Sequence, residues 1–138
     1  AGNFNQAEID CALELVDICL TNERQTDYHV VVAQDGGSKV HAYACWGPVP
    51  MTKGAFDLYW IATRPEARGR GFGRALMDYV ESKASEMSGR LLVVETSSKA
   101  SYADTVEFYS RLGYAENSRI RDFYDVGDDK IIFVKRLS

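Results

Sequence analysis

The stretch RGRGFGRALM, residues 68–77, places three arginines and three glycines at the start of a predicted helix. From Gly71 to a stop at Gly89, apolar residues recur with the spacing of one helix face. The first N–H groups of a helix have no partner inside the helix, and with the macrodipole they form a site for an anion. The glycines let main chain approach a ligand closely. The stretch therefore predicts a helix start that binds phosphate.

Charge supports the same interpretation. Residues 64–74 contain four arginines and one glutamate, a local charge of +3, whereas the whole chain has a net charge of −4. A single charge at an exposed helix terminus contributes only about 0.3–1 kcal/mol, so several amides and arginines together are needed to hold a polyphosphate. A lone Gly-rich loop with solvated arginines would look similar, so other positions have to decide.

Composition limits the classes of protein that fit. A chain of 138 residues, 46% of them apolar, fits one domain, 1–138, and the charge is a poor match for nucleic acid. Cys11, Cys19 and Cys45 form an odd set without metal-ligand spacing, so we expect no metal and a cytoplasmic location. No apolar run reaches the roughly 18 residues that a membrane helix needs.

The elements on either side of the helix predict an α/β fold. We expect a helix over 7–20, strands over 28–33 and 39–47 around a turn at 35–37, and a strand over 55–63. After the helix that follows residue 71 come a buried strand over 90–97, a helix over 104–113, and two hairpin strands over 118–126 and 130–137. Ser101 and Asp104 fit a capping box, and Gly113 fits the left-handed position after the helix.

The glycine pattern is neither a Walker loop nor a dinucleotide fingerprint. Arg68, Gly71 and Gly73 spell R-x-x-G-x-G after a strand, and EFYSRLGY, residues 107–114, follows on a later helix. In these two motifs and in the order of its elements, the chain resembles the GNAT superfamily of N-acetyltransferases over roughly residues 7–137. Members usually open with one more strand and helix, so the chain either begins late or is a shortened version.

The resemblance implies a mixed, mostly antiparallel sheet with helices on both faces and a central parallel strand pair that splays around acetyl-CoA. It implies that the backbone of Ile61, Ala62 and Thr63 binds the pantetheine arm. The diphosphate would lie against the loop residues Arg68, Gly69, Arg70, Gly71, Phe72, Gly73 and Arg74. The expected reaction is direct transfer of acetyl to a small-molecule or peptide amine, and a homodimer is one option for the assembly.

The chemistry requires an acid and favours a base. Tyr109 matches the tyrosine that protonates the leaving thiolate in the family. A lysine-like amine is neutral only about one part in a thousand near neutral pH, a penalty of about 4 kcal/mol, whereas an α-amine costs far less. Glu95, at the end of an apolar strand, is our first choice of base, with Asp57 or water as alternatives. Either carboxylate could instead cap a strand end or pair with an arginine.

Other interpretations remain open at this level. The domain could bind acyl-CoA without catalysis, or it could use a longer acyl group or a non-amine acceptor. Small metabolites, antibiotic-like polyamines and protein N-termini all remain possible acceptors. Four aspartates around the last hairpin could attract a cationic amine, although aspartate beside glycine more often forms turns. We assign no role to His29 or His41.

Overall fold

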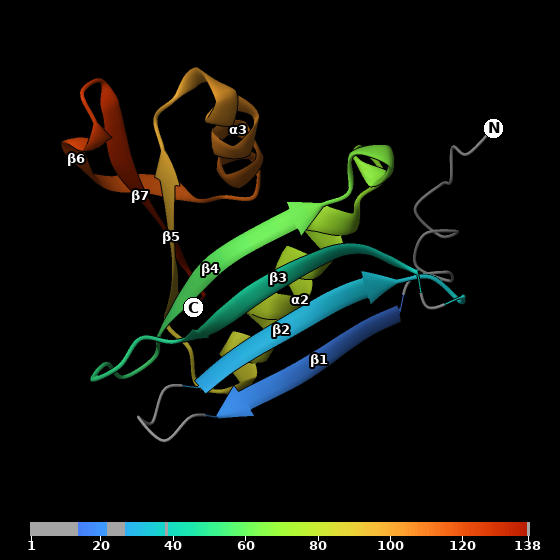
Figure 1. Ribbon diagram of the computed structural model, residues 1–138. Coiled ribbons are helices and arrows are strands. Elements are labelled where there is room, and N and C mark those ends of the chain that lie inside the picture. Colours follow the sequence, from blue (N-terminus) through green and yellow to red (C-terminus); the bar gives the residue numbers. More distant parts are fainter. Residues whose placement is uncertain (1–13, 22–26, 38, 138) are drawn as a thin grey trace.

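The computed structural model describes residues 14–21, 27–37 and 39–137. These residues form a twisted sheet with two helices packed against it (Figure 1). The strands of the described residues are β1 (Glu14–Thr21), β2 (Asp27–Gln34), β3 (Val40–Pro48), β4 (Ala55–Thr63), β5 (Leu91–Ser97), β6 (Ala115–Asp125) and β7 (Asp128–Arg136). The helices are α2 (Phe72–Glu86) and α3 (Ala103–Arg111), with 3-10 turns η1 (Pro65–Ala67) and η2 (Ala100–Tyr102).

The order of strands across the sheet is β1-β2-β3-β4-β5-β7-β6. Every neighbouring pair is antiparallel except β4 and β5, which are parallel and joined through α2. A parallel pair needs a long crossover, and the helix that begins at the glycine loop supplies it. The predicted mixed sheet with one central parallel pair is therefore confirmed.

One predicted element is wrong. Residues 14–21 form strand β1, not the second half of a helix over 7–20, and residues 7–13 lie outside the described part of the chain. β1 pairs with β2 over its whole length. Asp17 lies in the sheet near the core, where His29 Nδ1 lies 3.3 Å from its carboxylate and the Tyr79 hydroxyl donates to it. Because the acidic Asp17 lies on the inner face, the sequence lacks the alternation of apolar and polar residues that marks a strand. The β-branched residues Val16 and Ile18 were the remaining indication of one.

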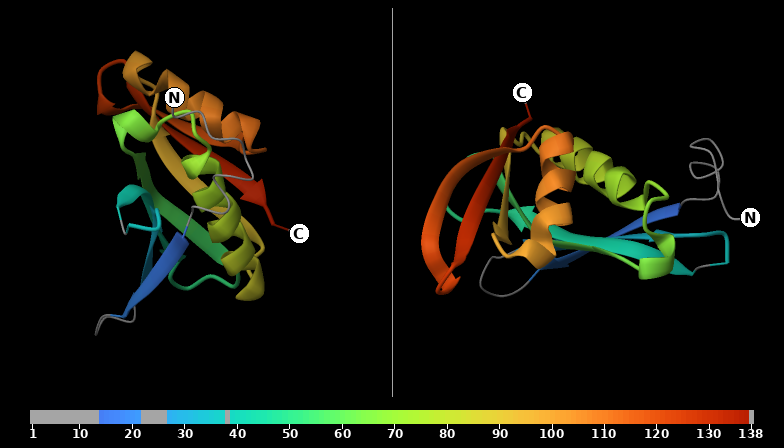
Figure 2. Two further views of the ribbon diagram at one scale, coloured as in Figure 1. Left: turned by 90° about the vertical axis from the view of Figure 1, so that its right-hand side faces the viewer. Right: turned by 90° about the horizontal axis from the view of Figure 1, so that it is seen from above.

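The core lies between the sheet and the helices. On α2 the buried residues are Phe72, Leu76, Met77, Val80 and Ala84. They join one cluster with Trp46 of the sheet and with Tyr109 of α3. Each large apolar side chain buried in this way contributes about 1.5–3 kcal/mol. Both described helices lie on one face of the sheet (Figure 2), whereas the resemblance implied helices on both.

The turns follow the expected chemistry with one exception. At the 35–37 turn, the Asp35 carboxylate accepts the N–H groups of Gly37 and Lys39 at 2.8 and 3.1 Å. Gly113 has φ 93°, as predicted for the residue after α3. The capping box is wrong: Tyr102 occupies the N-cap of α3, and no side chain caps the helix. The reason is that residues 100–102 form the separate turn η2.

Candidate active site

The parallel strands β4 and β5 separate part of the way along. Their pairing runs from Ala55 opposite Leu91 to Leu58 opposite Val94 and ends there. Beyond that point β4 stays paired with β3 as far as Thr63, while β5 pairs with β7 on its other side. Peptide groups of β4 from 59 to 63 that face β5 therefore have no ladder partner on that strand. This is the splay that the resemblance implied.

A bulge in β4 accompanies the separation. Trp46 of β3 lies opposite Leu58 and Cys45 opposite Trp60, so Tyr59 is an extra residue in the ladder. A bulge bends its strand and increases the local twist. The sequence gives no sign of it, because β4 is rich in apolar residues on both faces.

A cavity of ≈ 430 Å³ opens where the strands separate. Its walls come from β4, β5, η2, α3 and the β6–β7 hairpin. The lining residues are Tyr59, Trp60, Ile61, Glu95, Thr96, Ser97, Lys99, Tyr102, Thr105, Tyr109, Tyr124 and Asp128. Two predicted catalytic residues, Tyr109 and Glu95, thus line one cavity, and the predicted cofactor residue Ile61 lines it with them. Asp57 is not part of the lining.

Tyr109 lies at the boundary between the core and the cavity. Only 3% of the residue is exposed, and its ring packs edge-on against Phe108 and Tyr114 and near Phe133. Burial disfavours the phenolate and raises the pKa of Tyr109 to about 12. The side chain therefore keeps its proton at neutral pH and can act as a donor. It is both a core aromatic and a cavity residue.

The two carboxylates proposed as base differ in their surroundings. The Glu95 side chain is half exposed and forms an ion pair with Lys130 at 3.1 Å, so it is not buried as its place in an apolar strand suggested. Asp57 lies further back on the neighbouring strand, where burial and, secondly, the charge of Glu95 raise the pKa of its carboxyl. Glu95 therefore has the better position, on the cavity itself, whereas Asp57 has a carboxyl whose pKa is raised above its ordinary value.

The glycine loop connects the end of β4 with the first turn of α2 (Figure 1). Gly69 and Gly71 have φ of 77° and 85°, a conformation that side chains disfavour, and Gly71 is the N-cap. Gly73 has another role: a Cβ there would lie 3.2 Å from the ring of Phe108, so this glycine lets α3 pack against α2. Arg68 and Arg74 are exposed, and the Arg70 guanidinium lies over the Phe72 ring at 5.2 Å.

His41, for which no role was predicted, contacts residues on both sides of this loop. Its ring stacks on Phe72 with centroids 4.9 Å apart, and Asp35 lies 3.0 Å from its Nε2. The carbonyl of His41 accepts the N–H of Arg64, just before the loop. His41 is the extra residue where β3 slips against Gln34, which turns it inward. No alternation pattern reveals such a slip.

Most residues of the cavity wall were not predicted from the sequence. Tyr59, Trp60, Tyr102 and Tyr124 come from three separate segments and carry no motif. Within the described ranges, no group of three or more His, Cys, Asp or Glu side chains is arranged to hold a metal ion. None of the helices that the structure describes has the length and apolarity to cross a membrane.

Comparison with known proteins agrees with this geometry. A splayed parallel pair followed by a glycine loop at a helix start defines a class of domain that takes an extended ligand with an anionic end. Residues 26–116 match the acetyltransferase (GNAT) domain family. The chain belongs to the GNAT acetyltransferase family.

Three relatives illustrate the similarity. The chain is 28% identical over 117 residues to S-alkylcysteine N-acetyltransferase of Bacillus subtilis, covering 80% of this chain and 65% of that protein, just under two thirds of its length. A crystal structure from Desulfovibrio desulfuricans, of a protein assigned to the GNAT family, matches with TM-score 0.78 and 42% identity over 80% of this chain and 69% of that one. The ribosomal-protein-S18-alanine N-acetyltransferase of Escherichia coli matches with TM-score 0.69 and 26% identity over 86% and 72%.

Proposed function

We propose that this protein is an N-acetyltransferase that transfers the acetyl group of acetyl-CoA directly to an amine. The observation that carries the proposal is the end of the β4–β5 pairing at Leu58 and Val94, together with the cavity that opens there beside Tyr109. A silent acyl-CoA-binding module would need the loop and the splay. It would not need a protonated tyrosine and a carboxylate on the same cavity.

The residues present fit acetyl-CoA. The amide-rich pantetheine arm can pair with those peptide groups of Ile61, Ala62 and Thr63 that point away from β3, as if it were another strand. From Thr63 the chain runs through η1 to the loop of residues 68–74, where the first N–H groups of α2 and the exposed Arg68 and Arg74 suit a diphosphate. Acetyl-CoA would supply the thioester that the cavity presents to the amine.

Two residues of the chain would move the protons. Tyr109 donates its proton to the departing thiolate, a role that its raised pKa permits throughout the neutral range. Glu95 takes the proton from the attacking amine, directly or through water, because it is the glutamate that lines the cavity. Asp57 is the alternative base and would have to act through water. Cys45 is buried and its pKa is raised by that burial, which argues against a covalent route.

The acceptor is proposed to carry an α-amine. S-alkylcysteine, the substrate named for the Bacillus subtilis relative, is an α-amino acid. An α-amine is about half neutral at its pKa of about 8, so it needs much less help from a base than a lysine-like amine does. We place the protein in the cytoplasm, since Cys19 and Cys45 are both free.

The sharpest test compares acetyl-CoA with acetyl-pantetheine, which lacks the diphosphate. In a free-thiol release assay with an amine acceptor, the double variant Arg68→Ala/Arg74→Ala should raise the KM for acetyl-CoA about tenfold or more, as expected for lost charge-assisted hydrogen bonds. The KM for acetyl-pantetheine should not change. Arg111→Ala, which removes an exposed arginine of α3 that pairs with Glu107, is the matched control.

Two results would contradict the proposal. If the double variant raised the KM equally for both thioesters, the loop would not be the binding site of the diphosphate. Tight binding of acetyl-CoA without release of thiol on any amine would favour the silent module.

A further inference from the structure

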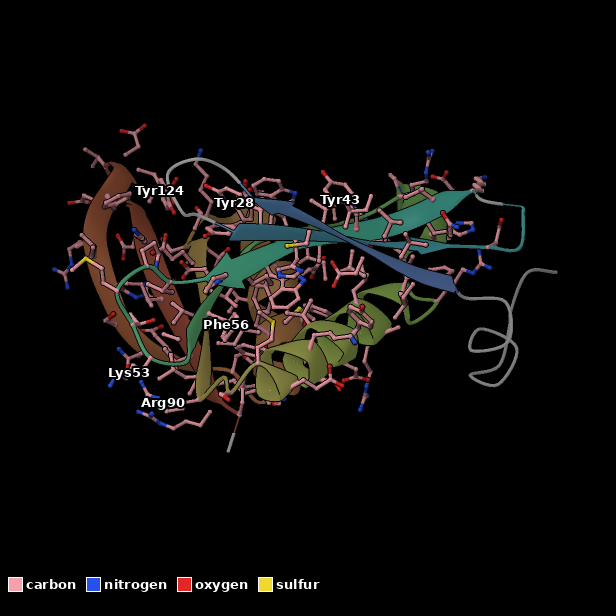
Figure 3. The ribbon with its side chains drawn as sticks, turned by 90° about the horizontal axis from the view of Figure 1, so that it is seen from below. Tyr28, Tyr43, Lys53, Phe56, Arg90 and Tyr124 are labelled. Atoms are coloured by element: carbon pink, nitrogen blue, oxygen red, sulfur yellow. The ribbon has the colours of Figure 1, made fainter. Side chains whose placement is uncertain are left out.

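The cavity wall is unusually rich in aromatic side chains. Tyr59, Trp60, Tyr102 and Tyr124 line it, and Tyr28 packs against Tyr59 with ring centroids 5.5 Å apart. Trp60, Tyr102 and Tyr124 are 52%, 45% and 49% exposed. Figure 3 shows Tyr28 and Tyr124 on the side of the sheet away from α2. Large apolar side chains gathered at a concave site mark a surface that a ligand covers.

The charged groups of the same cavity already have partners. Glu95 pairs with Lys130 at 3.1 Å. Asp128 accepts a hydrogen bond from the Ser97 hydroxyl, and its carboxylate lies 3.8 Å from Lys99. Each carboxylate of the lining thus has an ammonium group beside it, Asp128 that of Lys99 in the lining and Glu95 that of Lys130 outside it.

The other aspartates of the β6–β7 hairpin are occupied in its turns. Asp122 and Asp125 accept the N–H groups of Gly127 and Val126. Asp129 accepts the N–H of Asp122 and pairs with Arg119 at 3.1 Å. The hairpin aspartates are therefore turn formers, and the alternative of an acidic rim that collects cationic amines is not supported.

We propose that the acceptor is a primary amine with one apolar or aromatic substituent and no second positive charge. This inference rests on the proposed function and narrows its substrate class. An apolar substituent would cover the exposed aromatic wall. A second ammonium would lose its water without gaining an unpaired carboxylate. Aromatic faces do attract cations, but Lys99 and Lys130 already stand beside this wall and would repel another.

The test uses two amines of equal length. Hexylamine and 1,5-diaminopentane each have seven heavy atoms and differ only in a methyl group against a second amine. We expect kcat/KM with acetyl-CoA to favour hexylamine at least about tenfold. Tyr124→Ala should lower kcat/KM for hexylamine about tenfold, because it removes part of the wall, and Met51→Ala, a fully exposed residue outside the cavity, should not. Lys130→Met, which leaves Glu95 unpaired, should shift the preference towards the diamine.

Binding is measured separately from catalysis. The chain has two tryptophans, and Trp46 is fully buried whereas Trp60 lines the cavity. A change of tryptophan emission on adding an amine therefore reports on Trp60. Emission that responds to hexylamine and not to the diamine, without thiol release on these or any other amines, would uphold this inference and overturn the proposed function.

The reverse outcomes are equally distinct. Equal or better use of the diamine, with transfer intact, would overturn the inference and leave the function standing. No binding and no transfer with either amine would overturn the inference, whereas the proposed function is overturned only if no amine, α-amines included, supports thiol release.

Discussion

Replacing Tyr109 with phenylalanine tests both the proposed acid and its raised pKa. The substitution keeps the ring that packs against Phe108 and Tyr114, so the core should retain its shape. It removes only the hydroxyl at the cavity. General acids of this kind contribute about 10²- to 10⁴-fold, so we expect kcat to fall within that range.

The raised pKa of Tyr109, about 12, also predicts how kcat depends on pH. A tyrosine with the ordinary pKa of about 10 would lose its proton, and activity would decline, from about pH 9 upward. With the raised pKa, kcat of the wild type should stay level to about pH 11 once the amine is neutral.

Stability should change in a related way. Because folding raises the pKa of Tyr109, its contribution to stability is complete below pH 10 and is lost as pH rises towards 12. At pH 11 this loss is about 1.4 kcal/mol, and Tyr109→Phe should not show it.

The assays are thiol release from acetyl-CoA between pH 7 and 11 and urea unfolding at pH 8 and 11. Tyr114→Phe is the control: its hydroxyl donates to Glu81 at 2.9 Å and not to the cavity. We expect it to cost about 1–3 kcal/mol of stability and leave kcat unchanged. Unaltered turnover in Tyr109→Phe would refute the role of the acid. A wild-type decline near pH 10 that Tyr109→Phe lacks would refute the raised pKa.

Four further substitutions examine the base and the loop. With a lysine-like amine such as hexylamine, which is almost wholly protonated at neutral pH, Glu95→Gln should lower kcat/KM at least about 100-fold and Asp57→Asn much less; a larger loss in Asp57→Asn would assign the base to Asp57. Gly73→Ala should cost about 1–3 kcal/mol in denaturant unfolding, because its Cβ meets Phe108; full stability would show that α3 can give way. His41→Ala should raise the KM for acetyl-CoA several-fold with kcat preserved, whereas an unchanged KM would show that the stack does not support the loop.

The sequence predicted the parts of the molecule that repeat a simple period. Amphipathic α2 and the apolar strand β5 follow from spacing, and the loop glycines at 69 and 71 follow from the backbone geometry that a helix start needs. It failed at β1, where Asp17 occupies an inner position and is matched by His29 and Tyr79 from other elements. Partners that come from other strands and helices cannot be recognised from the residues next to Asp17 in the sequence.

The candidate site shows the same division. Tyr109 and Glu95 were found because each lies in or beside a recognisable motif. The aromatic wall was missed, since Trp60, Tyr102 and Tyr124 meet only after the sheet has formed and its hairpin has folded back. Slips in the ladder, at His41 and at Tyr59, decide which side chains face inward, and periodicity cannot reveal them.

The extra residue Tyr59 determines to which face of the sheet each later side chain of β4 points. Deleting it would move Trp60, Ile61, Ala62 and Thr63 each to the opposite face, because side chains alternate along a strand. We expect the shortened strand to continue its ladder with β5 across the opening. We therefore expect one extra residue in β4 to make the difference between a continuous β4–β5 ladder and the open one of this structure.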